Sequence, residues 1–438
     1  MTEYMKQAKV IVVGGGAAGM MAAGRAAERG AEAFLLEKTE SPGKKLLITG
    51  KDRCNFTNSA ELDAFIREFG NKGNFLYPAF FNFFNEDLKK FFEGLGVKSK
   101  VERGGRVFPA SDRSEDIHKA LLNYMKSGRV NLLYETRVKD LVVRKGRVSA
   151  VKTKADEAIG CSSVILCTGG VSYPGTGSTG DGYKIAKKHG HTITELRPAL
   201  VPLETKEEWP KELQGLSLEN VRVTAKCSYK KIAEEFGDML FTHFGVSGPI
   251  ILSMSKKIGK WLANKNPPLS PFSEGGDKKD SVERSSVVLI IDLKPALDLE
   301  KLDQRLRRDL IKYSNKTFGN SLDDLLPKSL IPVIVRFSFI PEDKPANTIT
   351  RKERRYLAEL LKALPFEISK TRPIEEAIIT SGGIALEEID NRTMESKIVK
   401  GLYFAGEVVD LDAPTGGYNL QMAFSTGRLA GESASRNS

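Results

Sequence analysis

The sequence predicts an α/β protein in which a discontinuous first domain encloses an inserted domain, itself β-rich with a helical part. An apolar run, a glycine-rich turn and a helix of small residues follow one another near the N-terminus. Short apolar runs that end in glycines return near the C-terminus. Between them, strand-like and helical segments of ordinary polarity alternate. We therefore expect residues 1–194 and 372–438 to form the first domain and residues 195–371 the insert, with its helical part near 298–364.

Residues 9–38 predict one βαβ unit. The run Val10–Val13 has the composition of a buried parallel strand. Glycines then fit G-x-G-x-x-G, small residues predict a helix over 17–29, and a second apolar run over 33–36 ends at Glu37. Strand, glycine turn, helix, strand and acid in this order are typical of a Rossmann-type dinucleotide-binding domain.

Each residue type in this unit has a physical reason. Gly14 permits the tight turn, Gly16 lets the backbone approach a pyrophosphate, and Gly19 with the neighbouring Ala18 lets the helix pack closely on the sheet. The helix start offers free N–H groups to phosphates. Glu37 can accept hydrogen bonds from ribose hydroxyls, which argues against a 2′-phosphate. These residues alone do not distinguish FAD from NAD as the ligand.

Composition excludes several classes of protein. In 438 residues no apolar run approaches the roughly 20 residues of a membrane span, and the N-terminus lacks the apolar core of a signal peptide. The cysteines (Cys54, Cys161, Cys167 and Cys227) form no CxxC pair, so we expect a reducing cytoplasm, no redox disulfide and no metal site. The net charge of +11 suggests nucleic acid, but the basic residues are scattered and no RNA-binding motif accompanies them. We therefore expect a small-molecule substrate and no nucleic acid or membrane partner.

The polar, glycine-rich stretch 41–58 predicts a loop that passes over a ligand, with an ordinary surface loop as the alternative. Its Lys44, Lys45 and Arg53 could meet phosphates, and its Asn55, Thr57 and Asn58 could meet ring edges or ribityl hydroxyls.

Further elements follow from periodicity. We expect helices over 85–94, capped by Asn85, and over 114–127, 181–189, 299–312 and 351–364. Strands are expected over 130–153 with a hairpin turn at 144–146, and over 163–170, 198–205, 220–229 and 287–293. The polar segment 264–286 predicts a loop. A second G-x-G-x-x-G at 175–180 predicts no second Rossmann domain, because Pro174 and the preceding glycines interrupt the step from strand to turn.

The C-terminal part predicts the other half of a cofactor site. Strand-like runs over 375–384 and 401–407 precede a loop with Gly416 and Gly417, and a helix is expected over about 420–432. N–H groups at its start would stabilise negative charge on a reduced flavin, which favours FAD over NAD.

These pieces together resemble the BaiN-like flavoprotein family, described as NAD(FAD)-utilising dehydrogenases. The motifs that carry the resemblance span nearly the whole chain: VVGGGAAGMMAA, KKLLITGKDRCNFTNS, GRVFPASDRSEDI, GTGSTGDGYKIAKKHGHTI, FTHFGVSGPIILSMS and GLYFAGEVVDLDAPTGGYNLQ. One departure is Lys51–Asp52, where the family usually has a glycine pair.

The resemblance implies FAD, with NAD(P)H as a transient co-substrate. It places Gly14, Gly16 and Gly19 at the pyrophosphate, and Glu37 at the adenosine ribose. It places these further residues near the cofactor: Lys38 and Lys45 beside it, Asn58 on the flavin side, the backbone of Val138 at adenine, Gly406 and Glu407 at the ribityl-phosphate, and the backbone of Asn419 and Leu420 at the isoalloxazine. Val138 is expected at the end of the strand that starts at residue 131.

We predict a reductase that passes hydride from NAD(P)H through FAD to an electron-poor small molecule, with a conjugated C=C or a carbonyl, in a cleft between the first domain and the insert. Tyr418, His243 and Arg53 are candidates for the catalytic acid by chemistry alone, and Tyr418 and His243 could instead only shape the pocket. Two alternatives stay open: a flavin oxidase of an amine or ketone that uses O₂, and an FAD-containing RNA-binding or RNA-modifying protein, suggested by a pI near 9.2.

Overall fold

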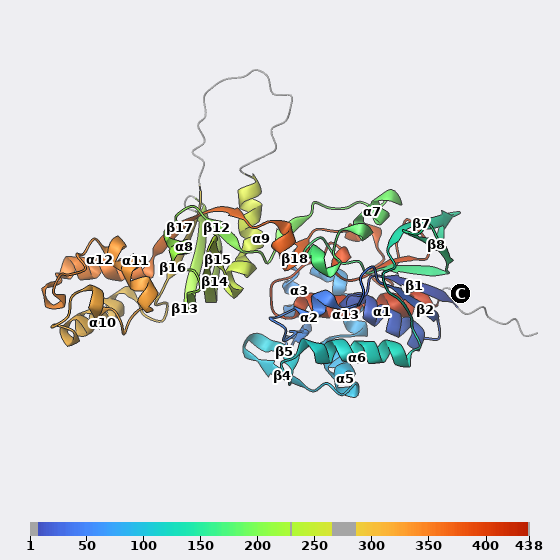
Figure 1. Cartoon of the computed structure of the whole chain (residues 1–438), viewed down its shortest axis with the longest axis horizontal. Helices are drawn as coiled ribbons and strands as arrows, with labels where there is room; N and C mark the ends of the chain where they lie inside the picture. The colour runs from blue at the N-terminus through green and yellow to red at the C-terminus, as the bar shows by residue number, and fades with distance from the viewer. Residues whose placement is uncertain (1–7, 228–229, 265–285, 437–438) are drawn as a thin grey trace, which may run out of the picture. The chain divides into compact units, whose positions relative to one another are not determined.

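The computed structural model describes residues 8–227, 230–264 and 286–436 (Figure 1). The chain forms two compact units, one of Met1–Ala199 with Ile374–Ser438 and one of Leu200–Pro373. We expected the insert to start at 195, but β11 (Arg197–Ala199) pairs with β18 (Ile379–Ser381) inside the first unit. The loop expected over 264–286 lies, apart from its two ends, outside the described residues.

The first unit is built on a five-stranded sheet in the order β19-β10-β1-β2-β6, and every pair in it is parallel. Its strands are β1 (Lys9–Val13), β2 (Glu32–Leu36), β6 (Asn131–Leu133), β10 (Ser163–Leu166) and β19 (Leu402–Phe404). The residues of β10 and β19 are all buried, as expected for a parallel sheet covered on both faces. The sheet joins strands from both ends of the chain, which confirms the α/β fold with a discontinuous Rossmann-type domain.

Helices α1 (Ala17–Glu28) and α13 (Tyr418–Ser435) lie side by side (Figure 1). Glycines let them approach closely: a Cβ on Gly427 would lie 2.4 Å from the Ala18 carbonyl oxygen, and one on Gly431 would lie 2.3 Å from that of Ala22. Since a close-packed interior cannot admit an extra methyl group at such distances, these positions fix how the C-terminal helix meets the N-terminal one.

Other elements surround this core. The helices are α2 (Lys44–Leu47), α3 (Leu62–Arg67), α4 (Tyr77–Asn82), α5 (Asn85–Gly94), α6 (Ser114–Ser127) and α7 (Asp181–Lys188). Two small sheets are β3-β5-β4, of β3 (Thr57–Asn58), β4 (Ser99–Glu102) and β5 (Arg106–Pro109), and β7-β8-β9, of β7 (Val138–Arg144), β8 (Arg147–Thr153) and β9 (Ala158–Gly160).

Helices α5 and α6 confirm the predicted ranges, but the predicted cap of α5 was wrong. Phe84 occupies the N-cap, and its N–H donates to the Asp87 carboxylate at 3.0 Å. Asn85 already belongs to the helix, and its amide donates to the carbonyl oxygens of Asn58 (2.8 Å) and Ala60 (3.0 Å). The Asn85 amide therefore bonds to carbonyl oxygens distant in sequence, whereas the local sequence pattern predicted that this side chain caps the helix.

Three other expectations need correction. The expected loop over 41–58 contains one helical turn, α2, and the short strand β3. The expected continuous strand from residue 131 breaks at 134–137, so that Val138 begins β7 instead of ending the strand before it. Residues 375–384 were expected to be strand-like throughout, but only β18 within them is a strand. The β7–β8 hairpin was predicted correctly.

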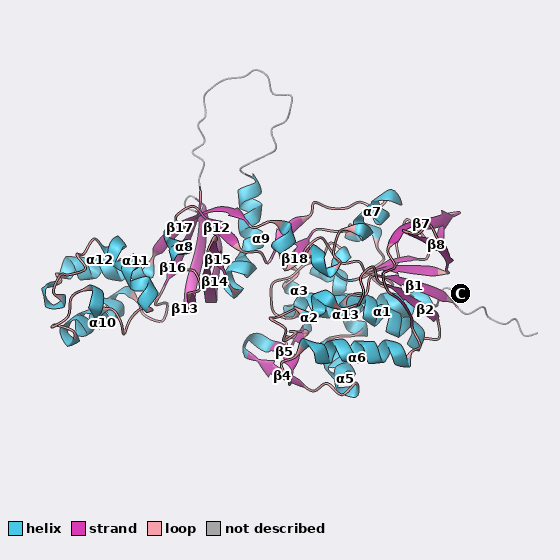
Figure 2. Ribbon diagram, viewed as in Figure 1, coloured by secondary structure: helices cyan, strands magenta, loops and turns pink. Residues whose placement is uncertain are grey.

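The second unit contains a closed barrel in the order β12-β15-β14-β13-β16-β17 (Figure 2). Its strands are β12 (Leu203–Thr205), β13 (Ser217–Cys227), β14 (Lys230–Thr242), β15 (Gly245–Ser247), β16 (Val287–Asp292) and β17 (Leu364–Thr371). Its helices are α8 (Trp209–Glu212), α9 (Pro249–Asn264), α10 (Leu299–Lys312), α11 (Ile331–Ser338) and α12 (Arg351–Lys362). The β-rich and helical character predicted for the insert is confirmed. Within the described ranges, no helix has the length and apolarity needed to cross a membrane.

Candidate functional site

In the turn between β1 and α1, two of the three motif glycines have no room for a side chain. Gly14 has φ +99°, and a Cβ there would lie 2.6 Å from the Cys167 carbonyl oxygen. A Cβ on Gly19 would lie 1.9 Å from the Gly14 carbonyl oxygen, whereas one on Gly16 would meet nothing within 4 Å. Gly16 is the N-cap of α1, and no side chain caps this helix. The first-turn N–H groups of α1 therefore have no side-chain acceptor, and the space beside them is open, which is the arrangement that binds phosphate.

Glu37 follows β2 and holds the glycine turn in place. One carboxylate oxygen accepts the N–H of Gly15 at 2.7 Å, and the other accepts the N–H of Thr39 at 2.9 Å. The side chain is buried, so these charge-assisted bonds fix its position. Each carboxylate oxygen keeps a further lone pair, so the group can still accept a hydrogen bond from a ligand hydroxyl.

The second glycine motif lies against the first. A Cβ on Gly177 would be 3.6 Å from the Lys38 side chain and 3.7 Å from the Glu37 carboxylate. Lys38 donates to Thr179 and forms an ion pair of 2.9 Å with Asp181, which also pairs with Arg137 at 2.6 Å. Because β10 lies beside β1 in the same sheet, this motif extends the first domain, and the described residues contain no second Rossmann domain. The Lys38 ammonium is engaged by protein groups.

Lys45 and Glu407, which are far apart in the sequence, meet in the structure. The Lys45 ammonium donates to Ser172 at 2.7 Å and to the Glu407 carboxylate at 2.8 Å. The other Glu407 oxygen accepts the N–H of Thr380 at 2.9 Å. A Cβ on the adjacent Gly406 would lie 2.7 Å from the Ala18 Cβ. The C-terminal half-site therefore touches the first turn of α1.

The start of α13 is a second helix N-terminus without a side-chain cap, and Gly417 is its N-cap. A Cβ on Gly417 would lie 2.2 Å from the Thr57 carbonyl oxygen, so the 55–58 segment lies directly against it. The Asn58 amide donates to the carbonyl oxygens of Gly104 and Gly416, both at 3.0 Å. The Asn419 amide donates to the Ala413 carbonyl oxygen at 2.8 Å and its oxygen accepts the Ala413 N–H at 2.9 Å. Both amides shape the loop, while the first-turn N–H groups of Tyr418, Asn419 and Leu420 have no intrahelical acceptor.

Six buried side-chain oxygens among the described residues have no hydrogen-bond partner, and two of them concern this site: the Asn55 side-chain oxygen and the Thr168 hydroxyl. The Asn55 oxygen would lie 2.8 Å from a Cβ on Gly417. The Thr168 Cα would lie 3.0 Å from a Cβ on Gly14, and its hydroxyl oxygen would lie 2.0 Å from a Cβ on Gly182, in the first turn of α7. Buried polar atoms are rarely unsatisfied in native proteins, so these two are candidates for ligand contacts. Sequence reasoning considered Asn55 only within a polar loop and missed Thr168, whose one signal is its position after a parallel strand.

The three acid candidates lie in different surroundings. The Tyr418 ring is partly buried and packs edge-on against Phe65 at 4.7 Å between centroids. Burial, together with the nearby Glu68 carboxylate, raises the pKa of Tyr418. The Arg53 guanidinium is held by Glu102 and Asp112. His243 is exposed at the turn between β14 and β15 in the second unit.

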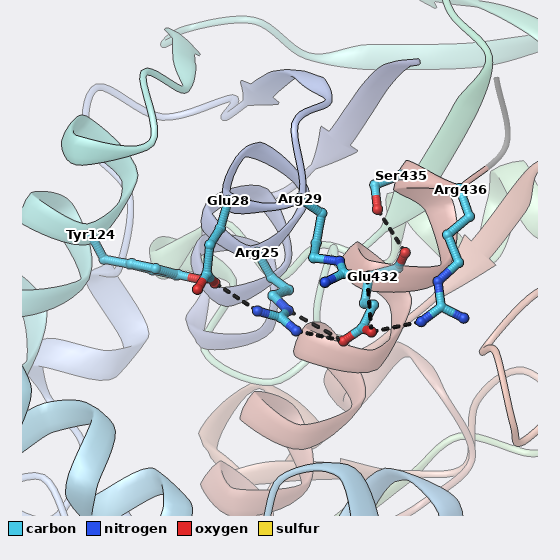
Figure 3. A network of polar contacts seen from close by, with 7 residues as sticks. All are labelled: Arg25, Glu28, Arg29, Tyr124, Glu432, Ser435 and Arg436. Carbon is cyan, nitrogen blue, oxygen red and sulfur yellow. Dashed lines mark hydrogen bonds and ion pairs between the residues drawn. The ribbon is translucent and has the colours of Figure 1, made fainter. Parts of the chain in front are cut away.

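A polar network at the far ends of α1 and α13 joins the two halves of the first unit (Figure 3). Arg25 on α1 donates to Glu432 on α13 at 2.8 Å and to Glu28 at 3.0 Å. Tyr124 on α6 donates to Glu28 at 2.6 Å, and Arg436 donates to Glu432 at 2.7 Å. Burial alone would raise the pKa of Glu432, but the arginines around it hold that pKa below its usual range. The network fixes α13, whose other end is the candidate site.

The parallel sheet and its glycine turn define an α/β protein with a Rossmann-type domain. The family model of the HI0933-like protein Rossmann domain matches residues 8–433, and the chain belongs to this family.

Similar proteins match nearly the whole length of the chain. The 3-dehydro-bile acid delta(4,6)-reductase of Clostridium scindens is 31% identical over 430 residues, which are 97% of this chain and 98% of that protein. The ribosomal RNA dihydrouridine synthase of Escherichia coli is 29% identical over 423 residues, 96% of each chain. The solved structure of 3-ketosteroid delta1-dehydrogenase from Sterolibacterium denitrificans matches with a TM-score of 0.55 at 12% identity over 99% of this chain and 100% of that one, which is a likeness of fold.

Proposed function

We propose that this FAD-dependent oxidoreductase reduces a carbon–carbon double bond conjugated to a carbonyl in a small molecule, with NAD(P)H as the reductant. The observation that carries the proposal is the full-length similarity to a reductase whose name describes a 3-ketone with double bonds at positions 4 and 6. Dihydrouridine, in the name of a second relative, is the product of adding two hydrogens to the uracil double bond beside a carbonyl. The two names share one reaction type.

The residues present fit FAD. The uncapped start of α1 suits a pyrophosphate, and Glu37 suits a ribose. The uncapped start of α13 suits the electron-rich edge of a reduced flavin. The unpaired Asn55 oxygen supplies a further hydrogen-bonding group beside the start of α13. A bound flavin would supply the hydride, and the chain's task is to hold and orient the ring and to exclude water.

Reduction of a conjugated double bond also needs a proton, and Tyr418 is the best-placed donor of the three candidates. Its hydroxyl is protonated at neutral pH, as is usual for tyrosine, and burial raises its pKa further. Arg53 is engaged by two carboxylates, and a guanidinium does not release its proton in proteins. Tyr418→Phe should therefore lower turnover by about 100-fold, the usual contribution of general acid catalysis, while the flavin is still bound and reduced.

Product analysis tests the proposal. The purified holoprotein is incubated anaerobically with NADPH or NADH and a 3-oxo-4,6-diene steroid acid. The products are then separated and their molecular masses are measured by mass spectrometry. We expect a product heavier by two hydrogens and a stoichiometric loss of reduced nicotinamide. Oxygen consumption with an amine or ketone, with no reduced product, would instead establish the oxidase alternative.

A second candidate is an RNA-modifying reductase that acts on uracil. Two observations favour it: the relatives from Escherichia coli and Haemophilus influenzae named ribosomal RNA dihydrouridine synthase, at 29% and 28% identity, and the net charge of +11. Formation of dihydrouridine in an RNA transcript incubated with the holoprotein and NADPH would support this candidate. A transcript left unmodified while the steroid is reduced would dismiss it.

A further inference from the structure

An aromatic pair is exposed on the helical part of the second unit, where α10, α11 and α12 cluster beside the barrel (Figure 2). The Phe339 side chain is 81% exposed and Tyr356 is 42% exposed, and their ring centroids are 6.1 Å apart. Phe339 ends α11 with φ +57°, a conformation that a bulky residue rarely adopts. An exposed phenylalanine in strained backbone gains little from folding, which indicates that its ring serves something outside the fold.

The rings lie among basic side chains. Lys352, Arg355, Tyr356 and Glu359 are spaced i, i+3, i+4 and i+7 along α12, so they share its exposed face, opposite the buried Leu357, Ala358 and Leu361. Helices α10 and α12 together carry ten basic and five acidic side chains. This part of the chain therefore has the charge that complements a polyanion.

Most of the acids on these helices are already neutralised. Asp303 pairs with Arg354 at 2.8 Å, Asp309 with Arg305 at 3.6 Å, Glu353 with Lys344 at 2.6 Å and Glu359 with Arg355 at 3.3 Å. In the part of the chain that the structure describes, Arg307, Arg308, Arg351 and Lys352 form no ion pair, and all four are exposed.

The helices run antiparallel, which gathers these cations. Arg354 of α12 meets Asp303 of α10, and Lys362 of α12 donates to the Leu297 carbonyl oxygen just before α10. One turn back from Arg354 is Arg351, and one turn forward from Asp303 is Arg307, so these two lie at the same level. Two exposed acids, Glu342 and Asp343, follow Phe339 closely, and the Glu342 side chain is turned against Gly319.

We propose that Phe339, Arg351, Lys352, Arg355 and Tyr356, called here the aromatic–basic patch, bind unpaired bases of an RNA. A base stacks on the exposed Phe339 ring, and the cations contact the flanking phosphates. Aromatic faces among Lys and Arg are the combination that holds single-stranded nucleic acid, since stacking accepts any base and the cations neutralise the backbone. The proposal rests on the RNA-modifying candidate and gives that candidate a binding surface on the insert.

The test uses the full-length holoprotein and a fluorescein-labelled RNA hairpin with a uridine-rich loop, with binding followed by anisotropy. The double variant Phe339→Ala/Tyr356→Ala should weaken binding by about 10- to 100-fold, because base–aromatic stacking contributes strongly to such complexes. Phe81→Ala is the matched control. Phe81 is also exposed, at 75%, and stacks with Tyr77 at 5.9 Å, but this aromatic pair lies beside an acid, because the Tyr77 hydroxyl donates to the Asp63 carboxylate. Arg351→Gln/Lys352→Gln should reduce the salt dependence of binding.

The outcomes separate the patch from the function. Loss of binding in the aromatic double variant, with Phe81→Ala like the wild type, supports the patch. Equal binding by the wild type and the double variant would overturn the patch and leave the RNA-modifying candidate standing. If the wild type binds no RNA even at low salt, both the patch and the RNA-modifying candidate are overturned. Reduction of the small molecule by the same preparation would then still support the proposed small-molecule reductase. Unchanged thermal unfolding of every variant shows that the fold is intact.

Discussion

Glu37 gives the sharpest test of the cofactor assignment, through Glu37→Gln. The glutamine keeps the size of the side chain but turns an NH₂ group toward one of the two N–H groups, of Gly15 and Thr39, that the carboxylate now accepts. A hydrogen bond to a charged group contributes about 1.5–3 kcal/mol, and one of the two is lost. If the loss falls on the form that binds FAD, the FAD dissociation constant rises by about 10- to 100-fold, since about 1.4 kcal/mol corresponds to tenfold.

The assay is fluorescence titration of the deflavinated variant with FAD, beside chemical unfolding of the apoprotein. Glu32→Gln is the matched control, because Glu32 lies at the start of β2, the strand that Glu37 follows, and is exposed. We expect the control to bind FAD like the wild type and Glu37→Gln to fold but bind weakly. Wild-type FAD affinity in Glu37→Gln would refute the role given to this carboxylate. An unfolded variant would show that its hydrogen bond with the Gly15 N–H is needed for folding before it is needed for FAD binding.

Three further predictions concern the frame around the site. Gly431→Ala should lower the free energy of unfolding by about 1–3 kcal/mol in urea denaturation, because its Cβ would lie 2.3 Å from the Ala22 carbonyl oxygen, whereas Ser433→Ala should be neutral. Because the folded-state pKa of Glu432 is depressed, its stabilisation is present above the ordinary value of 4.5 and is lost as the pH falls through the lower folded value. In a plot of melting temperature against pH, Glu432→Gln should lessen the fall on the acidic side. An unchanged fall would contradict the role given to the network. Lys51 has φ +56°, so Lys51→Gly should be about 1 kcal/mol more stable than Lys51→Ala in the same assay, and equal stability would contradict backbone strain there.

The repeating features of the fold could be predicted from sequence because they are local. The run Val10–Val13, the glycine turn and the acid at Glu37 define a βαβ unit within one short stretch. The helical periods of α5, α6 and α10 gave their ranges correctly. The return of short strands and glycines near the C-terminus predicted the discontinuous domain, and β19 does join the sheet beside β10.

Features that depend on distant partners could not be predicted. Asn85 has the chemistry of an N-cap, but its amide bonds to the carbonyl oxygens of Asn58 and Ala60. Lys45 was predicted beside the cofactor, yet its ion pair with Glu407 joins residues that no sequence pattern relates. Thr168 carries no motif and is distinguished only by a buried hydroxyl without a partner. Such contacts are set by the packing of the sheet and helices, which a linear pattern does not record.

One anaerobic absorbance experiment tests together whether the chain binds FAD and whether the bound FAD reduces a conjugated double bond. The spectrum of the purified protein is recorded, NADPH is added until the flavin bands bleach, and a 3-oxo-4,6-diene steroid acid is then added without oxygen. We expect the flavin bands to return as the substrate is reduced. Flavin bands that stay bleached with this substrate and with a uracil-containing RNA would contradict the proposed reaction. A protein without flavin bands, even after incubation with FAD, would contradict the cofactor assignment itself.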